Sequence, residues 1–133
     1  MYANDRYGYF ATLPSGFTKE SESANGDGAT FEDKNLDIEC SIFGRNNISG
    51  LDASAIQETW WNGSSNSTSG SGDNWVSLEQ FDGDEVEYHF AYVGTGSIVE
   101  LQMEGDARNL SEFEAAASSI ANSIIPGDLK SSH

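Results

Sequence analysis

Apolar residues occupy every second position along three stretches of the chain. These stretches are residues 36–42, 86–92 and 99–103. A period of two places successive side chains on opposite faces of a β-strand, so each stretch predicts a strand with one buried face. Shorter runs, rich in aromatic and β-branched residues, end at turn-forming residues and are also typical of strands. They predict further strands at 6–13, 29–32 and 75–81.

Two segments show the spacing of an amphipathic helix instead. Residues 52–61 carry apolar side chains at i, i+3 and i+7, and Asp52 is the predicted N-cap. Residues 110–124 carry a longer apolar stripe, and Ser111 with Glu114 three residues later predicts a capping box. A Pro-Gly pair follows, as is typical of a helix end.

The predicted elements follow the order β-β-β-α-β-β-β-α with short connections. The last three strands are joined too closely for a crossover, so we expect an antiparallel meander. An antiparallel sheet must cover its apolar face, and the two helices are available as cover. The sequence therefore predicts an α+β fold, with an antiparallel sheet of about six strands covered by two helices. We expect one domain over residues 1–133, with an ordered core of about 4–129. The polar stretch that begins at Ser64 and ends at Ser71 fits either a loop or an edge strand.

Charge narrows the range of partners. The chain carries 22 Asp and Glu against six Lys and Arg, for a net charge of −16. Proteins that bind nucleic acid or anionic lipid surfaces use basic side chains, so this composition excludes both classes. No apolar run approaches the roughly 18 residues of a membrane span, so we expect no membrane insertion by this domain. The charge is interpreted as a solubilising coat, which leaves open a basic partner or a loosely held cation.

A series of short aromatic and glycine-turn motifs runs along most of the chain. The motifs are Arg6-Tyr7-Gly8-Tyr9, Pro14-Ser15-Gly16-Phe17, Asn25-Gly26-Asp27-Gly28, Gly72-Asp73-Asn74-Trp75, the hairpin from Asp82 to Gly94, and Ile124-Ile125-Pro126-Gly127-Asp128-Leu129. In their order and spacing, from about Asn4 to Leu129, they resemble the PsbP-like domains found in bacterial exported proteins and lipoproteins.

The resemblance implies both a fold and a setting. The fold is a PsbP-like α/β/α sandwich around an antiparallel sheet, and the characterised members of the superfamily mainly bind partners. It implies an accessory or binding role outside the bacterial cell, at the surface or secreted, with a signal segment or lipid anchor upstream of this chain. The family pattern leads us to expect a more apolar strand at residues 64–71. The polar stretch found there departs from that pattern.

No catalytic motif is present. Cys40 shares its parity with the apolar residues around it, which predicts a buried thiol. His89 falls on the polar parity of its strand, so the two side chains would make a poor nucleophilic dyad. The chain has no G-x-S-x-G, no phosphate loop and no zinc-ligand spacing. We expect a noncatalytic monomer without a cofactor, which binds an unidentified protein or small ligand.

Carboxylates are the remaining candidates for chemistry. Asp82, Asp84 and Glu85 cluster at one predicted hairpin, and Asp27 lies at another turn. Calcium prefers several hard oxygen ligands on flexible loops, so these four residues are candidate ligands of a weak calcium site. A small carboxylate-dependent hydrolase is the alternative function. It requires at least one of the four to line a closed pocket with a raised pKa.

Two adjacent tryptophans suggest a binding surface. Trp60 and Trp61 point about 100° apart on the predicted helix, and Trp60 fits the buried face. An exposed Trp61 would serve to anchor a partner or stack on a sugar. The other interpretation is that Trp61 packs at the sheet edge beneath the Ser-rich stretch. Together with Arg6 and Tyr7 of the first strand, Trp61 forms the predicted binding set.

Overall fold

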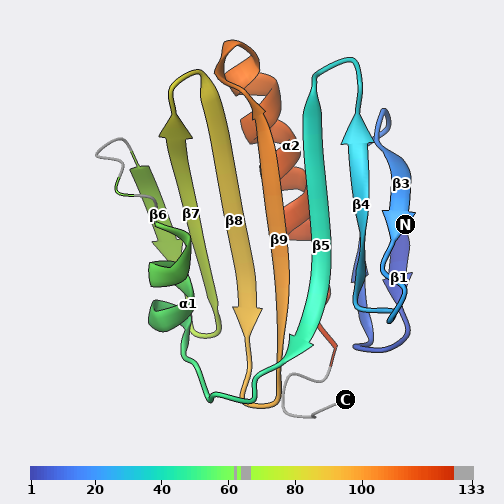
Figure 1. Ribbon diagram of the computed structural model, residues 1–133, viewed down its shortest axis with the longest axis vertical. Coiled ribbons are helices and arrows are strands. Elements are labelled where there is room, and N and C mark those ends of the chain that lie inside the picture. Colours follow the sequence, from blue (N-terminus) through green and yellow to red (C-terminus); the bar gives the residue numbers. More distant parts are fainter. Residues whose placement is uncertain (62, 64–66, 128–133) are drawn as a thin grey trace.

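Nine β-strands and two α-helices occupy the part of the chain that the computed structural model describes, residues 1–61, 63 and 67–127 (Figure 1). The strands are β1 (Tyr2–Asn4), β2 (Tyr9–Ala11), β3 (Thr18–Glu22), β4 (Gly28–Asp33), β5 (Ile38–Asn46), β6 (Ser67–Ser71), β7 (Trp75–Asp82), β8 (Glu85–Val93) and β9 (Ser97–Asp106). The helices are α1 (Ala53–Trp60) and α2 (Leu110–Ser123), and the 3-10 turn η1 (Ala107–Asn109) leads into α2. Seven strands form one antiparallel sheet in the order β3-β4-β5-β9-β8-β7-β6, while β1 and β2 form a separate hairpin. The predicted α+β fold is confirmed.

The two faces of the large sheet are covered unequally. Helix α2 lies behind the sheet in Figure 1, and the short α1 lies in front of one end. We call these the α2 face and the open face. Beneath α2 and the β1–β2 hairpin lies the main core, which includes Phe31, Cys40, Ile42, Leu101, Met103, Phe113 and Ile120. Beneath α1 lies a smaller core of Ile56, Val76, Ala91 and Ile98.

The β1–β2 hairpin supplies aromatic side chains to the main core. Tyr2 and Tyr9 meet in a T-shaped contact with their ring centroids 6.0 Å apart, and the Tyr9 hydroxyl donates to the carbonyl of Asp27 at 3.0 Å. The predicted strand at 6–13 is correct only for Tyr9–Ala11. Gly8 has a φ of +71°, which an L side chain rarely adopts, so a turn replaces the first part of that strand.

Polar strands form both edges of the sheet. All five residues of β3 are exposed, so it has no buried face and shows no apolar alternation in the sequence. At the other edge, β6 shows that residues 67–71 of the Ser-rich stretch form a strand, whereas residues 64–66 lie outside the described residues. So do Asp128 and Leu129, the end of the predicted core. The strand predicted at 6–13 lies in the separate hairpin, so five predicted strands and these two edge strands make up the seven of the large sheet. The polarity of the edge strands disfavours pairing with another chain.

The sequence prediction of the helix N-terminus is correct for α1 and wrong for α2. Asp52 caps α1 as predicted, since its Oδ1 accepts from the Ala55 N–H at 2.9 Å. The predicted capping box of α2 is wrong. The helix begins at Leu110 with Asn109 as its N-cap, which places Ser111 inside the first turn. The 3-10 turn η1 connects β9 to α2, and the capping hydrogen bond is at the start of this turn, before α2 begins. There the Arg108 N–H donates to Asp106 Oδ1 at 2.9 Å.

The close approach of α2 to β9 generates a stability prediction. A Cβ at Gly105 would lie only 2.6 Å from Cδ2 of Phe113, a ring that is fully buried. Gly105→Ala should therefore lower the free energy of unfolding by about 1–3 kcal/mol, the usual cost of overpacking a core. Urea denaturation measures this change. Adding Phe113→Leu removes the clashing ring, so the double variant should lose less than the sum of the two single variants; simple additivity would contradict the steric explanation.

Candidate functional site

The strands of the open face carry a row of four glutamates. Glu32 of β4 is the cross-strand partner of Glu39 of β5, Glu39 is also the partner of Glu104 of β9, and Glu104 is also the partner of Glu87 of β8. All four side chains point away from α2, because the neighbouring positions of each strand fill the main core. We call this row the glutamate ladder. Like charges directly opposite one another destabilise a sheet, so the ladder is a cost that the fold carries.

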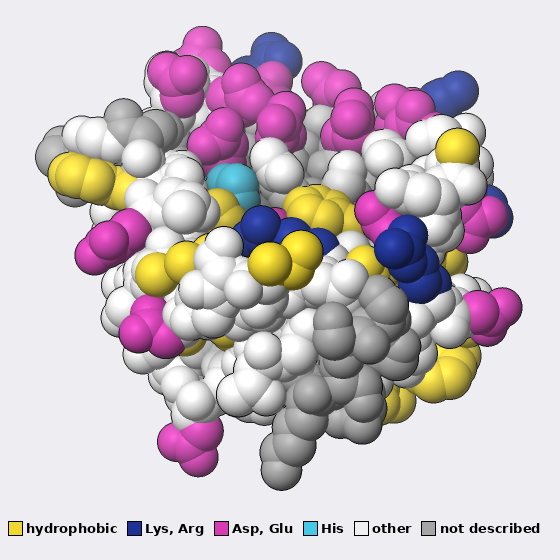
Figure 2. All heavy atoms as spheres, turned by 60° about the horizontal axis from the view of Figure 1, so that its bottom comes forward, with side chains coloured by type: hydrophobic (Ala, Val, Ile, Leu, Met, Phe, Trp, Pro, Cys, Tyr) yellow, Lys and Arg dark blue, Asp and Glu magenta, His cyan; other side chains and the backbone are white. Residues whose placement is uncertain are grey.

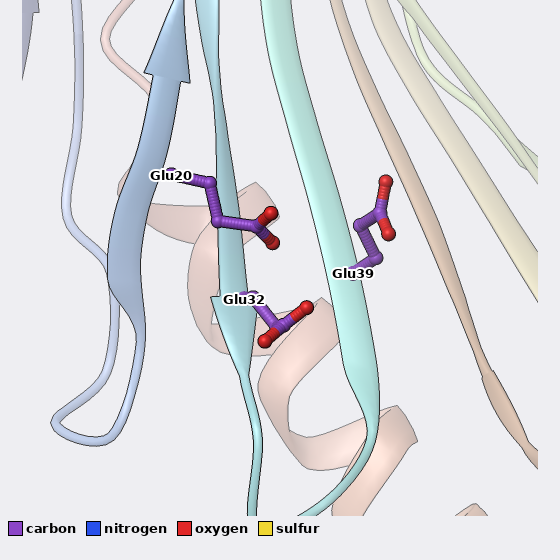
Figure 3. Close-up of side chains that lie close together, drawn as sticks. All are labelled: Glu20, Glu32 and Glu39. Carbon is purple, nitrogen blue, oxygen red and sulfur yellow. The ribbon is translucent and has the colours of Figure 1, made fainter.

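Further carboxylates extend the ladder at both ends. The side chains of Glu20, Glu32 and Glu39 project from β3, β4 and β5 into one space (Figure 3), and their carboxylate oxygens lie within 4.8 Å of one another. At the other end, Glu85 forms a second group of the same kind with Glu87 and Glu104. Many acidic side chains gather along the top of the view in Figure 2, while others are scattered over the rest of it. We call the ladder together with Glu20 and Glu85 the acidic band, or the band.

This crowding raises the proton affinity of the band. Burial raises the pKa of Glu104, and the neighbouring charges of Glu85, Glu87 and Glu39 raise it further. The pKa of Glu20 is also raised, first by desolvation, then by a hydrogen bond with Glu32 and by the charge of Glu32. A carboxyl whose pKa is higher in the folded state stabilises the fold most below its unfolded pKa, and loses that contribution as the pH rises through the folded pKa.

The four candidate calcium ligands do not form one site. Asp82, Asp84 and Glu85 are exposed and line an open hollow of about 500 Å³ together with part of the ladder. Asp27 lies elsewhere, where its Oδ1 accepts from the Arg6 guanidinium at 2.8 Å. None of the four lines a closed pocket, which is the feature that the hydrolase alternative required. Among the described residues, Glu85 is the one member that belongs to a group with metal-ligand spacing.

Next to the ladder, α1 closes one end of the open face. The Trp60 ring stacks on the imidazole of His89, with centroids 5.1 Å apart and an interplanar angle of 17°. The buried Gln80 amide donates to the Trp60 carbonyl at 2.7 Å and to Glu87 at 3.2 Å, which ties the end of α1 to the ladder. Burial lowers the pKa of His89 to about 4, so its imidazole is neutral at physiological pH.

Trp61 follows the helix and lies on the surface, as one of the two interpretations predicts. Its side chain is 59% exposed and lines a hollow of about 490 Å³ beside His89. An ion pair lies in the same hollow, with the Arg45 guanidinium 2.9 Å from a carboxylate oxygen of Glu100. Burial raises the pKa of Glu100, and Arg45 opposes that shift. The hollow thus combines an exposed indole with a neutral imidazole and a charge pair, and the binding role of Trp61 stays a prediction.

The structure does not bring Trp61 together with Arg6 and Tyr7. Tyr7 is buried on the α2 face, where its ring packs against Gly44 so closely that a Cβ there would lie 2.7 Å from it. Arg6 covers the Tyr7 ring at 5.3 Å from its centroid and is held by its ion pair with Asp27. These two residues thus seat the β1–β2 hairpin, on the side of the sheet opposite to Trp61.

Cys40 and His89 are separated by the sheet, as predicted. Cys40 is completely buried on the α2 face, where desolvation raises its pKa to about 12. His89 projects from the open face, because its cross-strand partner Gln102 has the parity of the ladder. The thiol is therefore neutral and inaccessible, and the two side chains form no dyad.

Comparisons with known proteins show which solved structures have a similar fold. No family model matches the sequence, and no curated protein matches it. Among solved structures, the chain is similar to the solution structure of cyanobacterial PsbP (CyanoP) from Synechocystis sp. PCC 6803, with a TM-score of 0.67. The match covers 94% of this chain and 90% of that one at 13% sequence identity. The chain has a PsbP-like fold.

The PsbP-like fold confirms the resemblance drawn from the aromatic and glycine motifs, and the identity level limits the comparison to the fold itself. The site has to be argued from this chain's own residues. Within the described parts of the chain, no helix is both long enough and apolar enough to cross a bilayer.

The stacking of Trp60 on His89 leads to a titration experiment. We expect the imidazole of His89, followed by NMR, to stay neutral down to about pH 5. Trp60→Ala should raise its pKa towards the ordinary value of about 6.5, because water regains access to the ring. Trp61→Ala, the matched control, should leave the titration unchanged. In the wild type, this residue's share of stability is present above pH 6.5 and is lost as the pH falls towards 4, because only the unfolded chain takes up the proton readily.

The ladder makes a second prediction, about charge. Glu39 has a glutamate opposite it on each side, so Glu39→Lys converts two repulsive pairs into two attractive pairs. We expect the free energy of unfolding to rise by about 1 kcal/mol at low ionic strength, and the gain to shrink as salt screens it. Urea denaturation at two salt concentrations measures both effects. Asp5→Lys, at an exposed turn, is the control; an equal gain there would show that net charge and not the ladder is responsible.

Proposed function

We propose that this protein is a noncatalytic binding domain whose open face receives a basic segment of a partner protein. The observation that carries the proposal is the glutamate ladder, which places four carboxylates in register on the part of the open face that α1 leaves uncovered. A sheet that only had to be soluble would alternate its charges, since opposed pairs of unlike sign stabilise it.

Lys34, directly after β4, lies near Glu20, and its charge partly opposes the raised pKa of that carboxyl group. The other four described Lys and Arg residues form ion pairs outside the ladder. Their salt bridges join Arg6 to Asp27, Lys19 to Glu22, Arg45 to Glu100 and Arg108 to Asp106. Among these ion pairs none includes a ladder glutamate. A partner's lysine and arginine side chains would supply positive charge that the fold itself places mostly elsewhere, and complementary charge of this kind also accelerates association.

The dimensions of the band favour a polypeptide. From β3 to β8 the band crosses five neighbouring strands, which spans about 19 Å at roughly 4.8 Å per strand. An extended or helical segment with several basic side chains matches a row of that length. Trp61 lies beyond the end of the ladder on the same face, where an exposed indole is suited to anchor an apolar residue of the same segment.

The chemistry of the described side chains supports a noncatalytic role. The thiol of Cys40 is buried with a raised pKa, and the pKa of His89 is too low for general base catalysis near neutral pH. The resemblance of the aromatic and glycine motifs to PsbP-like domains of bacterial exported proteins is the basis for proposing a location outside the cell, at the surface or secreted. A gene whose upstream sequence encodes neither an export signal nor a lipid-anchored cysteine would contradict that location.

A titration with decalysine peptide tests the docking face. The variant Glu32→Lys/Glu39→Lys/Glu104→Lys should bind the peptide about tenfold more weakly than the wild type at low ionic strength, because it inverts the centre of the ladder. Isothermal titration calorimetry measures both affinities, and circular dichroism verifies that each variant is folded.

The matched control has the same net charge. Asp5→Lys/Glu58→Lys/Glu112→Lys changes three exposed acidic residues outside the ladder. Equal weakening in both variants would show attraction to the whole acidic surface and overturn the proposal. Displacement of the peptide by low millimolar calcium, together with direct calcium heat, would instead identify the carboxylate groups as a cation site.

A further inference from the structure

A groove opens on the α2 face, on the side away from the glutamate ladder. It lies between α2 and the outer strands β7 and β8, with a volume of about 370 Å³. The strands contribute aromatic residues, and the helix contributes small and polar ones. We call it the α2–β8 groove, and its main lining residues are Trp75, Glu79, Tyr88, Tyr92, Glu114 and Asn122. The groove was not predicted from the sequence, because it depends on how far α2 reaches across the sheet.

The aromatic wall is held in place by its surroundings. Trp75 stacks on Phe90 with ring centroids 5.7 Å apart, and Tyr92 meets Phe90 edge-on at 5.1 Å. Glycines accommodate the indole, because a Cβ at Gly72 would lie 2.0 Å from the Trp75 Nε1 and one at Gly70 would lie 3.4 Å from the ring. The indole therefore rests against the polar edge of the sheet, and the aromatic rings are positioned before any ligand arrives.

The helical wall leaves room beside these rings. Glu114, Ser118 and Asn122 follow one another at intervals of four residues, so they form a polar rim along one side of α2. At the base of this wall are Ala117 and Ala121, which are buried and too small to fill the space above the strands. The result is a hollow with an aromatic side and a polar side.

The groove carries negative charge without a matching cation. Glu79 from β7 and Glu114 from α2 face each other across it and share a hydrogen bond. Burial, together with the hydrogen bond and the charge of Glu114, raises the pKa of Glu79 to about 7. No lysine or arginine is among the lining residues within the described part of the chain. The shared hydrogen bond requires a proton on one of the two carboxyl groups, so the pair carries one negative charge in that state. A bound positive charge would stabilise that negative charge and would favour ionisation of the second group.

We propose that the α2–β8 groove binds a small organic cation with an alkylated ammonium head, which would sit against Trp75 and Tyr92 and be neutralised by Glu79 and Glu114. Aromatic faces attract such cations through the ring quadrupole, and the interaction strengthens where water is displaced. Two carboxylates beside the rings supply the complementary charge.

Other ligand classes fit the groove less well. A divalent metal ion takes six to eight oxygen ligands or retains its water, whereas this site offers two carboxylates beside a wall of hydrocarbon. A neutral sugar would stack on the indole but would gain nothing from the pair of acidic groups. A weakly hydrated organic cation uses both sides of the groove, and the volume lies in the range of small-molecule sites.

The experiment compares choline with its uncharged isostere. We expect choline to shift the NMR signals of the Trp75 indole and the Tyr92 ring in a saturable titration. The alcohol 3,3-dimethylbutan-1-ol, which replaces the ammonium nitrogen by carbon, should bind at least about tenfold more weakly. Equal binding of the two would overturn the proposal, because it would show a merely apolar groove.

Paired variants localise the site. Tyr92→Leu and Glu114→Gln should each weaken choline binding by about tenfold, whereas Phe10→Leu in the hairpin and Glu112→Gln on the first turn of α2 should not. Unchanged affinity in both groove variants would contradict the proposal. So would co-sedimentation with phosphatidylcholine vesicles in the absence of any free-choline binding, since that result would identify a lipid surface and not a free solute as the ligand.

The test is independent of the proposed docking face. Inversion of the ladder should leave choline binding within about twofold of the wild type at a physiological salt concentration, where the Debye length is about 8 Å. Loss of decalysine binding with retained choline binding, and the reverse, would therefore separate the two surfaces.

Discussion

One constraint governs this molecule: a single fourteen-residue helix has to cover a seven-stranded sheet. At about 1.5 Å per residue, α2 is about 21 Å long, and it is about 10 Å wide. Seven strands spaced roughly 4.8 Å apart span about 29 Å. The β1–β2 hairpin covers part of the difference with its buried tyrosines, but β7 and β8 extend beyond the helix. The α2–β8 groove is the part of the apolar face that this cover does not reach.

The same constraint explains why most of the open face has no helical cover. The main core is complete once α2 and the hairpin have packed on one side, so the other side needs cover only where its residues are apolar. Helix α1 is placed there, over Val76, Ala91 and Ile98. The rest of that face carries polar side chains and stays uncovered. Both candidate surfaces thus follow from where the apolar positions stop along each strand.

Much of this architecture was predictable from periodicity, because burial acts on single strands and helices. The alternation around Cys40 and around His89 predicted the faces on which they lie, and the spacing from Leu110 onwards predicted the buried side of α2. The edge strand β3 was not predictable, since an exposed strand has no apolar period. The ladder escaped prediction for a different reason. Each of its glutamates has the expected outward parity, but their direct opposition depends on strand register, which a single sequence does not encode locally.

The structure also changes the interpretation of the net charge of −16. An even coat of acidic residues would only keep the protein soluble, yet the structure concentrates carboxylates in a band and in one groove. The two sites share β8, whose alternate side chains contribute Glu87 to one face and Tyr88 and Tyr92 to the other. A cation bound on either face lowers the negative potential felt on the opposite face. Occupancy of the two surfaces should thus be weakly antagonistic at low ionic strength and independent once salt screens charges across the sheet.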